Sequence, residues 1–596
     1  MSSVPERTDI ETEYQWDLES IYATDEAWEE AFAEVKGRLD ELSDYEGHAV
    51  EDGDTLLSVL ELRDDVMREV AKVSSYARMR SDEDTRDQEY QALSARASSL
   101  VSEASSAASF IEPEIQSLTA DELDELVAET PGLETYDHYF DDVLRQKEHT
   151  RSAEIEELLS EFGEVLGASG DTYSMLTNAD MTFPTVEKPD GSAVEISQGN
   201  FTNLLKNTDR EFRQTVHDSY FEELESVRNT IGSTLKNSVK ADVKSAEARF
   251  YDTAREAALD DTNVPVEVYD NLVDTVEDNL DKLHRHVELK ERHLGVDSLK
   301  PWDFYMPLAD SESPDIGYEE AKEYVVEAVA PLGEDYQNRV AEGLESRWVD
   351  VYENRGKRSG AYSGGTYDTQ PFILMNYQDD ISSMYTLAHE LGHSLHSEYT
   401  SEEQPYIYSN YEIFVAEVAS TVNEALLTHH LLDTVEDEAF RRHVLNEYLE
   451  RFRSTLYRQT LFADFEHRIH TLSEEGEALT PERLDEVYGD LKEAYYAPAE
   501  LDDHIRREWM RIPHFYYNYY VYQYSTGISA AVALVENILS EGEPAAERYL
   551  DFLSMGSREY PLDLLERAGV DMASPEPIES ALSVYDDYLD EMADLV

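Results

Sequence analysis

The stretch ISSMYTLAHELGHSLHSEYT, residues 381–400, holds the most informative local pattern in this chain. Within ten residues it carries three histidines and two glutamates, namely His389, Glu390, His393, His396 and Glu398. Apolar residues recur around them at helical spacings, namely Tyr385, Leu387, Ala388, Leu391 and Leu395. This periodicity predicts a helix that presents several metal-binding side chains on neighbouring faces.

His389 and His393 have the spacing that one metal ion requires. Four residues along a helix turn it by about 400° and rise about 6 Å, so both imidazoles lie on one face. With Glu390 they form the pattern H-E-x-x-H, in which the glutamate can reach a water beside the metal. Gly392, a poor helix former between apolar residues, indicates that another element packs closely here. The alternative is a chance match on a solvated acidic helix.

The same helix is poorly placed to supply a third metal ligand. His396 lies about 10.5 Å along the axis from His389, whereas metal–nitrogen bonds are only about 2.0–2.1 Å long. His396 is therefore better placed to support a ligand than to be one. The next predicted helix, 411–432, carries Glu417 among small and apolar neighbours, and Glu424 follows seven residues later on the same face. Glu417 is the best of several acidic candidates.

Composition excludes several classes of function. The chain has 596 residues, 41% of them hydrophobic, and 131 Asp and Glu against 48 Lys and Arg, for a formal net charge of -83. Such a surface repels nucleic acid and anionic lipid, so neither is expected as a partner. The acidic residues are spread along the chain, whereas a cation-binding protein would concentrate them in tracts. We interpret them as an adaptation to a salty cytoplasm, where a Debye length of about 3 Å at 1 M salt screens their repulsion.

Cysteine is absent, which excludes disulfides, thiolate zinc sites and cysteine nucleophiles. The N-terminus lacks the basic and apolar regions of a signal peptide. No apolar run approaches the roughly 20 residues that span a bilayer. We therefore expect a soluble, cytoplasmic protein with no membrane partner.

Most of the chain reads as amphipathic helix, for example over 54–79 and 514–540. Residues 180–197 break this rhythm with two β-prone runs around a turn at Pro189-Asp190-Gly191. Residues 359–377 break it again and predict a small sheet just before the histidine helix. The expected fold is all-α with small β-hairpins. We predict an N-terminal helical region, a middle helical segment with a hairpin, and a large catalytic region, over residues 1–111, 112–200 and 201–596.

Four longer stretches resemble a known family. They are AYSGGTYDTQPFILMNYQDDISSMYTLAHELGHSLHS (361–397), NYEIFVAEVASTVNE (410–424), RIPHFYYNYYVYQYSTG (511–527) and LKPWDFYMPL (299–308). Together they are similar to oligoendopeptidase F, a bacterial and archaeal branch of the thimet-oligopeptidase-like zinc metallopeptidases. The resemblance covers essentially the whole chain and is strongest over 300–530. It implies a two-lobed helical ellipsoid whose deep central channel holds one zinc ion and admits short peptides but not folded proteins.

The resemblance also implies roles for individual residues of the metal site. His389 and His393 match the zinc ligands, and Glu390 matches the catalytic base. Glu417, in the stretch Phe414-Val415-Ala416-Glu417, matches the third ligand with one extra residue. Glu424 matches a second glutamate that supports the ligands, and His396 stays open as an alternative ligand or a supporting residue.

Outside the metal site, the resemblance implies that His514 and a tyrosine stabilise the oxyanion of the reaction. Tyr520 is the first choice and Tyr524 the second, with Tyr519 and Tyr522 behind them. Without the family, an aromatic stripe is more simply explained as packing. Gly364, Gly365 and the strand after them border the channel in the family, where a peptide could pair with the strand edge by β-augmentation. Together with Tyr524, these two glycines are the expected substrate-binding residues.

The expected activity is therefore zinc-dependent hydrolysis of internal bonds in short oligopeptides. A zinc carboxypeptidase of the helical H-E-x-x-H type is one alternative, and it would use Arg507 or Arg511 to bind the substrate's terminal carboxylate. A metal-free, catalytically inactive peptide-binding protein is an alternative of another class.

Overall fold

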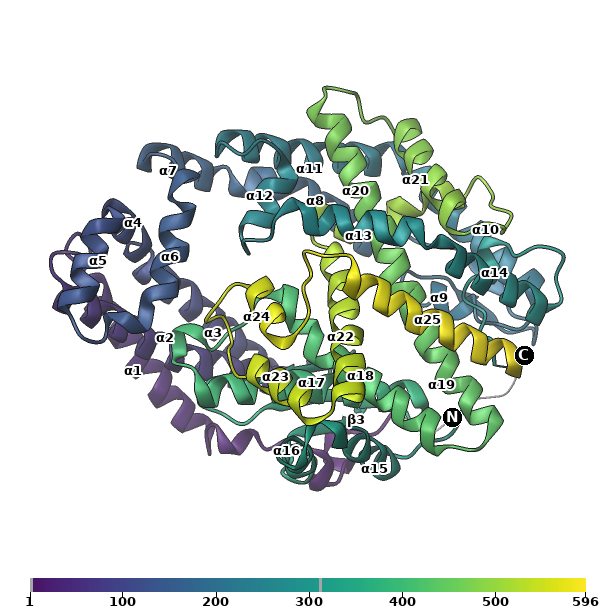
Figure 1. Ribbon diagram of the computed structural model, residues 1–596, viewed down its shortest axis with the longest axis horizontal. Coiled ribbons are helices and arrows are strands. Elements are labelled where there is room, and N and C mark those ends of the chain that lie inside the picture. The colour runs from purple at the N-terminus through teal and green to yellow at the C-terminus, as the bar shows by residue number, and fades with distance from the viewer. Residues whose placement is uncertain (1–3, 310–312) are drawn as a thin grey trace. The chain divides into compact units, whose positions relative to one another are not determined.

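The computed structural model (Figure 1) describes residues 4–309 and 313–596, and the chain groups into two compact units. Unit 1 comprises Met1–Glu148, Pro314–Asp433 and Leu534–Gly569, and unit 2 comprises His149–Ser313, Thr434–Ala533 and Val570–Val596. Both units are mostly helical, which confirms the predicted fold class. Each unit is assembled from separate stretches, so the contiguous segments 1–111, 112–200 and 201–596 stay a sequence-based prediction. The channel of the two-lobed ellipsoid likewise stays a prediction.

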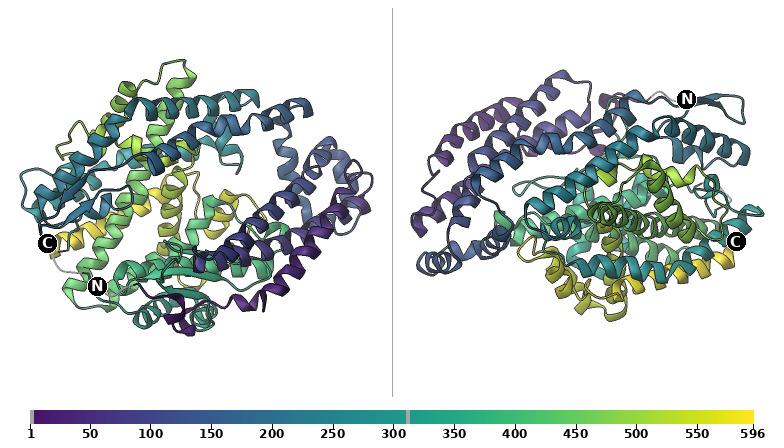
Figure 2. Two further views of the ribbon diagram at one scale, coloured as in Figure 1. Left: turned by 180° about the vertical axis from the view of Figure 1, so that it is seen from behind. Right: turned by 90° about the horizontal axis from the view of Figure 1, so that it is seen from above.

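Unit 1 begins with three long helices that pack side by side, α1 (Asp25–Ser43), α2 (Gly53–Glu83) and α3 (Gln88–Ala108), as Figure 2 shows. Each starts at a polar side chain that accepts a backbone N–H of the first turn; these caps are Thr24, Asp52 and Asp87. Their apolar faces enclose one core that includes Trp28 and Tyr76. The bundle therefore offers a rigid wall to the elements that follow.

A three-stranded sheet lies between this bundle and the histidine helix. Its order is β3 (Val349–Tyr352), β5 (Phe372–Tyr377) and β4 (Tyr362–Gly364), with β3 parallel and β4 antiparallel to β5. Phe372 and Leu374 point into the core of the α1–α3 bundle, while the histidine helix packs against β5 and β4. The small sheet predicted over 359–377 is confirmed, and β3 is an addition that the sequence did not indicate.

The histidine helix is α17 (Ile381–Glu403), which starts where the Asp380 side chain accepts the N–H of Ser383 at 2.8 Å. It crosses α18 (Ile413–Thr434) at Gly392. A Cβ atom on Gly392 would lie 2.5 Å from the Ala419 carbonyl oxygen and 2.6 Å from the Ser420 Cα. The close packing predicted from this glycine is confirmed, because only a residue without a side chain lets the two backbones approach so far.

Buried hydrogen bonds fix the register of α17 against α18. The Asn423 amide donates to the Ala388 carbonyl at 3.2 Å, and the Tyr385 and Thr428 hydroxyls are 2.8 Å apart. The remaining longer helices of unit 1 are α4 (Ile111–Ser117), α5 (Ala120–Glu129), α6 (Asp137–Arg145), α15 (Tyr318–Ala328), α16 (Glu334–Glu345), α23 (Glu543–Leu553) and α24 (Pro561–Ala568).

Unit 2 contains the predicted hairpin, formed by β1 (Thr185–Glu187) and β2 (Ala193–Glu195) with Val186 opposite Val194. Gly191 supplies the positive φ of its turn, at 84°. The helices of unit 2 are α7 (Ala153–Glu161), α8 (Gly163–Met175), α9 (Phe201–Leu204), α10 (Arg210–Ser226), α11 (Arg228–Ala248), α12 (Ala254–Asp260), α13 (Val266–Asp278), α14 (Leu280–Leu294), α19 (Glu438–Arg451), α20 (Arg458–Glu474), α21 (Pro481–Tyr495) and α25 (Glu576–Leu595).

The tyrosine-rich segment differs from the predicted continuous helix over 514–540. A short 3-10 turn covers Pro513–Tyr516, irregular backbone follows over 517–521, and α22 begins only at Tyr522 and ends at Glu541. Asn518 and Tyr519 have φ values of 45° and 57°, in the left-handed region that an α-helix does not use. We call residues 517–521 the tyrosine turn.

Across the described ranges 4–309 and 313–596, none of the helices pairs sufficient length with the apolar character that a bilayer crossing requires.

Candidate metal centre

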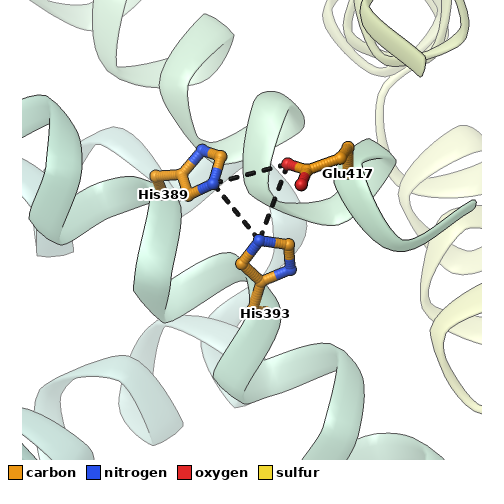
Figure 3. A group of neighbouring side chains, drawn as sticks. All are labelled: His389, His393 and Glu417. Carbon is orange, nitrogen blue, oxygen red and sulfur yellow. Dashed lines mark hydrogen bonds and ion pairs between the residues drawn. The ribbon is translucent and has the colours of Figure 1, made fainter. Parts of the chain in front are cut away.

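Three side chains from α17 and α18 converge in unit 1 (Figure 3). His389 and His393 come from successive turns of α17, and Glu417 reaches them from the first turns of α18. The two Nε2 atoms are 3.2 Å apart, and Glu417 Oε2 lies 3.4 Å from His389 Nε2 and 3.6 Å from His393 Nε2. Three potential ligand atoms thus surround one point at nearly equal separations.

The neighbours of these histidines suit a metal. Glu424, only 1% exposed, has Oε1 at 2.8 Å from His389 Nδ1, which favours a proton on Nδ1 and a lone pair on Nε2. The backbone of Ala416, one residue before Glu417, lies close enough to the His393 ring to act on its pKa. Two imidazole nitrogens and one carboxylate oxygen are donors that zinc accepts, with a fourth position open for water in catalytic sites. The residues present therefore fit a zinc ion.

Glu390 lies beside this group and is 6% exposed. Burial raises its pKa to about 7; the adjacent His389 opposes that rise and Glu417 adds to it. The backbone of Ser363, on strand β4, lies close enough to Glu390 to oppose the rise of its pKa as well. For the histidines, burial lowers the pKa of His393 to about 4, while Glu424 and Glu417 outweigh burial and raise the pKa of His389.

His396 is not part of the converging group. It is 1% exposed, and its ring stacks on Tyr411 with 3.6 Å between the ring centroids. Burial lowers its pKa to about 3, so the imidazole is neutral under ordinary conditions. Tyr411 is itself held by a 2.9 Å hydrogen bond between its hydroxyl and that of Ser397. The surroundings of His396 are those of a packed aromatic core.

A cavity of about 590 Å³ opens onto the metal-site residues. His389, Glu390, His393 and Glu417 all line it, and so do Gly364 and Gly365 from the end of β4. Strand β4 is an edge strand of its sheet, and Gly365 continues from it with a φ of 133°. Both glycines predicted to bind substrate therefore border the same cavity as the candidate ligands.

The other predicted residues, His514, Tyr520 and Tyr524, form an aromatic cluster in unit 2. The His514 ring lies 6.0 Å from each of the two tyrosine rings, and the Tyr524 hydroxyl donates to that of Tyr520 at 3.3 Å. Burial lowers the pKa of His514, and Arg458 lowers it further. Tyr519 and Tyr522 are 3% and 2% exposed, whereas Tyr520 and Tyr524 are partly accessible. Tyr520 and Tyr524 are therefore the more accessible of the four tyrosines, and their ranking at the oxyanion stays a prediction.

The arginines considered for a carboxypeptidase are held by other contacts in unit 2. Arg507 pairs with Glu225 at 2.8 Å and with Asp485 at 3.3 Å. The Arg511 guanidinium lies over the Phe201 and Tyr220 rings, at 4.8 and 5.4 Å from their centroids.

Two polar contacts have no signal in the sequence. Ser363 lies close to Glu390 although it precedes it by 27 positions in the chain, because β4 packs against α17. Glu466 of α20 accepts the N–H of Tyr519 at 2.7 Å. Glu466 belongs to no motif, and Ser363 lies in the stretch 361–397 without a predicted role, so only the fold brings each to its partner.

A helical fold that carries H-E-x-x-H on one helix and a converging glutamate on the next defines a metallopeptidase. A family model described as Peptidase family M3 matches residues 203–584, and one described as Oligopeptidase F matches residues 114–183. The oligopeptidase PepF of Bacillus subtilis is 48% identical over 596 residues, which is 100% of this chain and 89% of that protein. The group B oligopeptidase PepB of Streptococcus agalactiae is 43% identical and covers 99% of this chain and 98% of its own.

Solved structures agree with these matches. The crystal structure of oligoendopeptidase-F from Enterococcus faecium is 39% identical, with a TM-score of 0.74 over 96% of this chain and 99% of its own. A Chlamydophila abortus protein described as a peptidase is 32% identical, with a TM-score of 0.90 over 100% of both chains. The chain therefore belongs to peptidase family M3, as its resemblance to oligoendopeptidase F indicates, and it is a metal-dependent endopeptidase of oligopeptides.

Proposed function

We propose that the chain hydrolyses internal bonds of short peptides with one zinc ion held by His389, His393 and Glu417. The convergence of these three side chains within 3.2–3.6 Å of one another is the observation that carries the proposal. Glu424 supports it by orienting the His389 ring. When bound, zinc would polarise the scissile carbonyl group and lower the pKa of the attacking water.

The protein's own residues supply the proton transfers. Glu390 takes a proton from the attacking water and later delivers it to the leaving amine nitrogen. No covalent intermediate is needed, which suits a chain without cysteine. His514 and Tyr520 donate hydrogen bonds to the carbonyl oxygen as negative charge develops on it. Tyr524 supports Tyr520 through their hydroxyl contact.

Substrate binding is proposed at the edge strand β4 and at Gly364 and Gly365. A peptide that pairs with this edge would be held mainly through its backbone, so many side chains would be accepted. Absence of a Cβ at both positions lets the peptide backbone approach closely. The acidic surface fits a salty cytoplasm, where we place the protein, and its expected partners are peptides but not nucleic acids or membranes.

The decisive test is the substitution Glu390→Gln with metal content measured in parallel. We expect hydrolysis of an internally quenched oligopeptide to fall by at least about 10²- to 10⁴-fold, because the general base is lost. Zinc should remain near one ion per chain, because the ligands are untouched. A C-terminally amidated peptide should be cleaved internally by the wild-type enzyme, which separates an endopeptidase from a carboxypeptidase. Unchanged turnover in the variant would overturn the mechanism.

A further inference from the structure

The tyrosine turn adopts a backbone conformation that its own residues do not favour. Asn518 and Tyr519 follow one another with φ values of 45° and 57°. Asparagine enters the left-handed region readily, but for a bulky residue such as tyrosine it is an outlier. Such outliers persist only where the surrounding structure determines them. Contacts outside the turn must therefore hold Tyr519 in place.

Glu466 of helix α20 provides the backbone contact. Its Oε1 accepts the N–H of Tyr519 at 2.7 Å, and its side chain is 0% exposed. Burial raises the pKa of Glu466 to about 7, and His470 opposes that rise. Either protonation state of the carboxyl group leaves an oxygen that can accept the N–H. The turn is thus tied to α20 through one buried acceptor.

The Tyr519 side chain is seated by neighbours on α20 and α13. Its ring packs against the rings of His470 and Tyr269, with centroid separations of 4.7 and 5.6 Å. Its hydroxyl lies 3.3 Å from His467 Nδ1. Tyr269 is fixed in turn, because its hydroxyl donates to the Ala463 carbonyl at 2.6 Å. Both the backbone and the side chain of Tyr519 are therefore held by packed helices.

Glu466 is a poor choice for a residue that only fills the core. Within the part of the chain that the structure describes, its second oxygen, Oε2, is buried and has no hydrogen-bond partner. A buried polar atom without a partner destabilises the fold, whereas an apolar side chain of similar size would not. Among the described residues, the hydrogen bond that the carboxyl group makes is with the Tyr519 N–H. Its location is thus better explained by the turn than by stability.

The consequence falls on the next residue, Tyr520. When Tyr519 is fixed in the left-handed region, the direction in which the following side chain leaves the backbone is also fixed. Tyr520 then contacts His514 and Tyr524 at centroid separations of 6.0 and 5.4 Å. We propose that Glu466 is a positioning residue that holds the tyrosine turn and thereby directs the Tyr520 hydroxyl for catalysis. This inference rests on the proposed role of Tyr520 at the reacting carbonyl group.

The test is a double-mutant cycle between Glu466→Met and Tyr520→Phe in the full-length, zinc-loaded enzyme. Methionine has a similar length to glutamate but cannot accept the Tyr519 N–H. We expect Glu466→Met to lower kcat by about ten- to a hundredfold, as misplaced catalytic groups do, with KM and zinc content nearly unchanged. In the Tyr520→Phe background the same change should cause almost no further loss, because both changes act through one hydroxyl.

Two further variants serve as controls. Glu466→Gln keeps an oxygen that accepts the N–H, so it should restore most of the rate. Glu474→Ala removes another carboxylate of α20, whose hydrogen bond goes to the Ala254 N–H at 2.9 Å and whose influence on Tyr519 is through its charge. It should leave kcat unchanged. If Glu466→Met fails to fold, Asn518→Gly loosens the same turn without altering the core, and it should lower kcat by the same non-additive route.

The outcomes separate the inference from the proposed function. If Tyr520→Phe lowers kcat and Glu466→Met does not, the positioning role of Glu466 is overturned while the proposed mechanism stands. The positioning role is also overturned if Glu466→Met lowers kcat as much in the Tyr520→Phe background as in the wild-type enzyme. It is likewise overturned if the kcat of Glu466→Gln is no higher than that of Glu466→Met. If Tyr520→Phe leaves kcat unchanged, the catalytic role of Tyr520 is overturned. The positioning role of Glu466 is then overturned as well, because it depends on Tyr520.

Discussion

The candidate metal centre and the tyrosine turn achieve geometric precision by opposite means. In the metal centre, His389 and His393 are placed by the regular repeat of α17, and Glu417 is placed by the close contact of α18 with Gly392. In the tyrosine turn, Tyr520 follows two left-handed residues and depends on the buried acceptor Glu466. The geometry of a regular helix is set by its own hydrogen bonds, whereas that of an irregular turn is set by contacts with neighbouring elements.

This contrast leads to different expected responses. Changes in the metal centre should alter how tightly the metal is held, and activity should follow from that. Changes in the tyrosine turn should alter the rate of the chemical step while the metal stays bound. Metal content and kcat, measured on the same preparations, therefore distinguish the two regions.

The largest expected effect comes from Glu417→Ala. It removes one of three proposed ligands, so zinc affinity should fall by more than the roughly 10- to 100-fold loss typical of an outer partner. Activity at limiting zinc should fall with it. Zinc per chain after dialysis against a weak chelator, measured by mass spectrometry, checks this. Tyr520→Phe is the matched control and should retain its zinc; a Glu417→Ala enzyme with a full complement of zinc would contradict the ligand assignment.

The next effect is expected from Gly392→Ala. The new methyl group would lie within 2.6 Å of two backbone atoms of α18, which cannot move as a flexible side chain could. Overpacking of this kind costs about 1–3 kcal/mol, against a gain of at most about 1 kcal/mol in helix propensity. The variant should unfold at lower denaturant concentration and bind zinc more weakly, because α18 carries Glu417.

Gly37→Ala, in helix α1, is the control for that substitution, because nothing lies within 4 Å of its added methyl group. It should be neutral or stabilising by up to about 1 kcal/mol. Equal stability of the Gly392 and Gly37 variants would show that the contact between α17 and α18 can accommodate a methyl group. The contrast between the metal centre and the tyrosine turn would then weaken.

The smallest effect on metal binding is expected from His396→Phe. Phenylalanine keeps the stack on Tyr411 and removes both ring nitrogens, so zinc affinity should change by less than about threefold, well below the effect of an outer partner. Thermal stability is expected to change slightly, because the ring is buried. Zinc titration of the variant checks this, and loss of zinc would restore His396 as a ligand.

Much of the metal centre follows from the sequence because its geometry is local. The spacing of His389 and His393 places two imidazoles on one helical face whatever surrounds the helix. Gly392 indicated a close helix contact before any partner was known. The hairpin at Gly191 and the sheet before α17 were also readable, since both depend on turn residues a few positions apart.

Other features could not be predicted because they depend on distant contacts. Strand β3 is only four residues long, and its pairing with β5 joins Val349 to Ile373 across a crossover. The continuous helix predicted over 514–540 is wrong in its first part, because contacts with α20 override the helical pattern at Asn518 and Tyr519. The left-handed conformation of these residues is a tertiary effect that periodicity does not record.

The sequence by itself determined the class of fold, the helix that carries His389, Glu390 and His393, and the family. Helical periodicity and motif spacing involve residues only a few positions apart, so they can be read from the sequence alone. Only the tertiary structure decided which glutamate meets the two histidines, that His396 is packed on Tyr411, and that Glu466 supports the tyrosine turn. Each of these is a meeting of segments far apart in the chain, and such meetings are set by the packing of whole helices against one another.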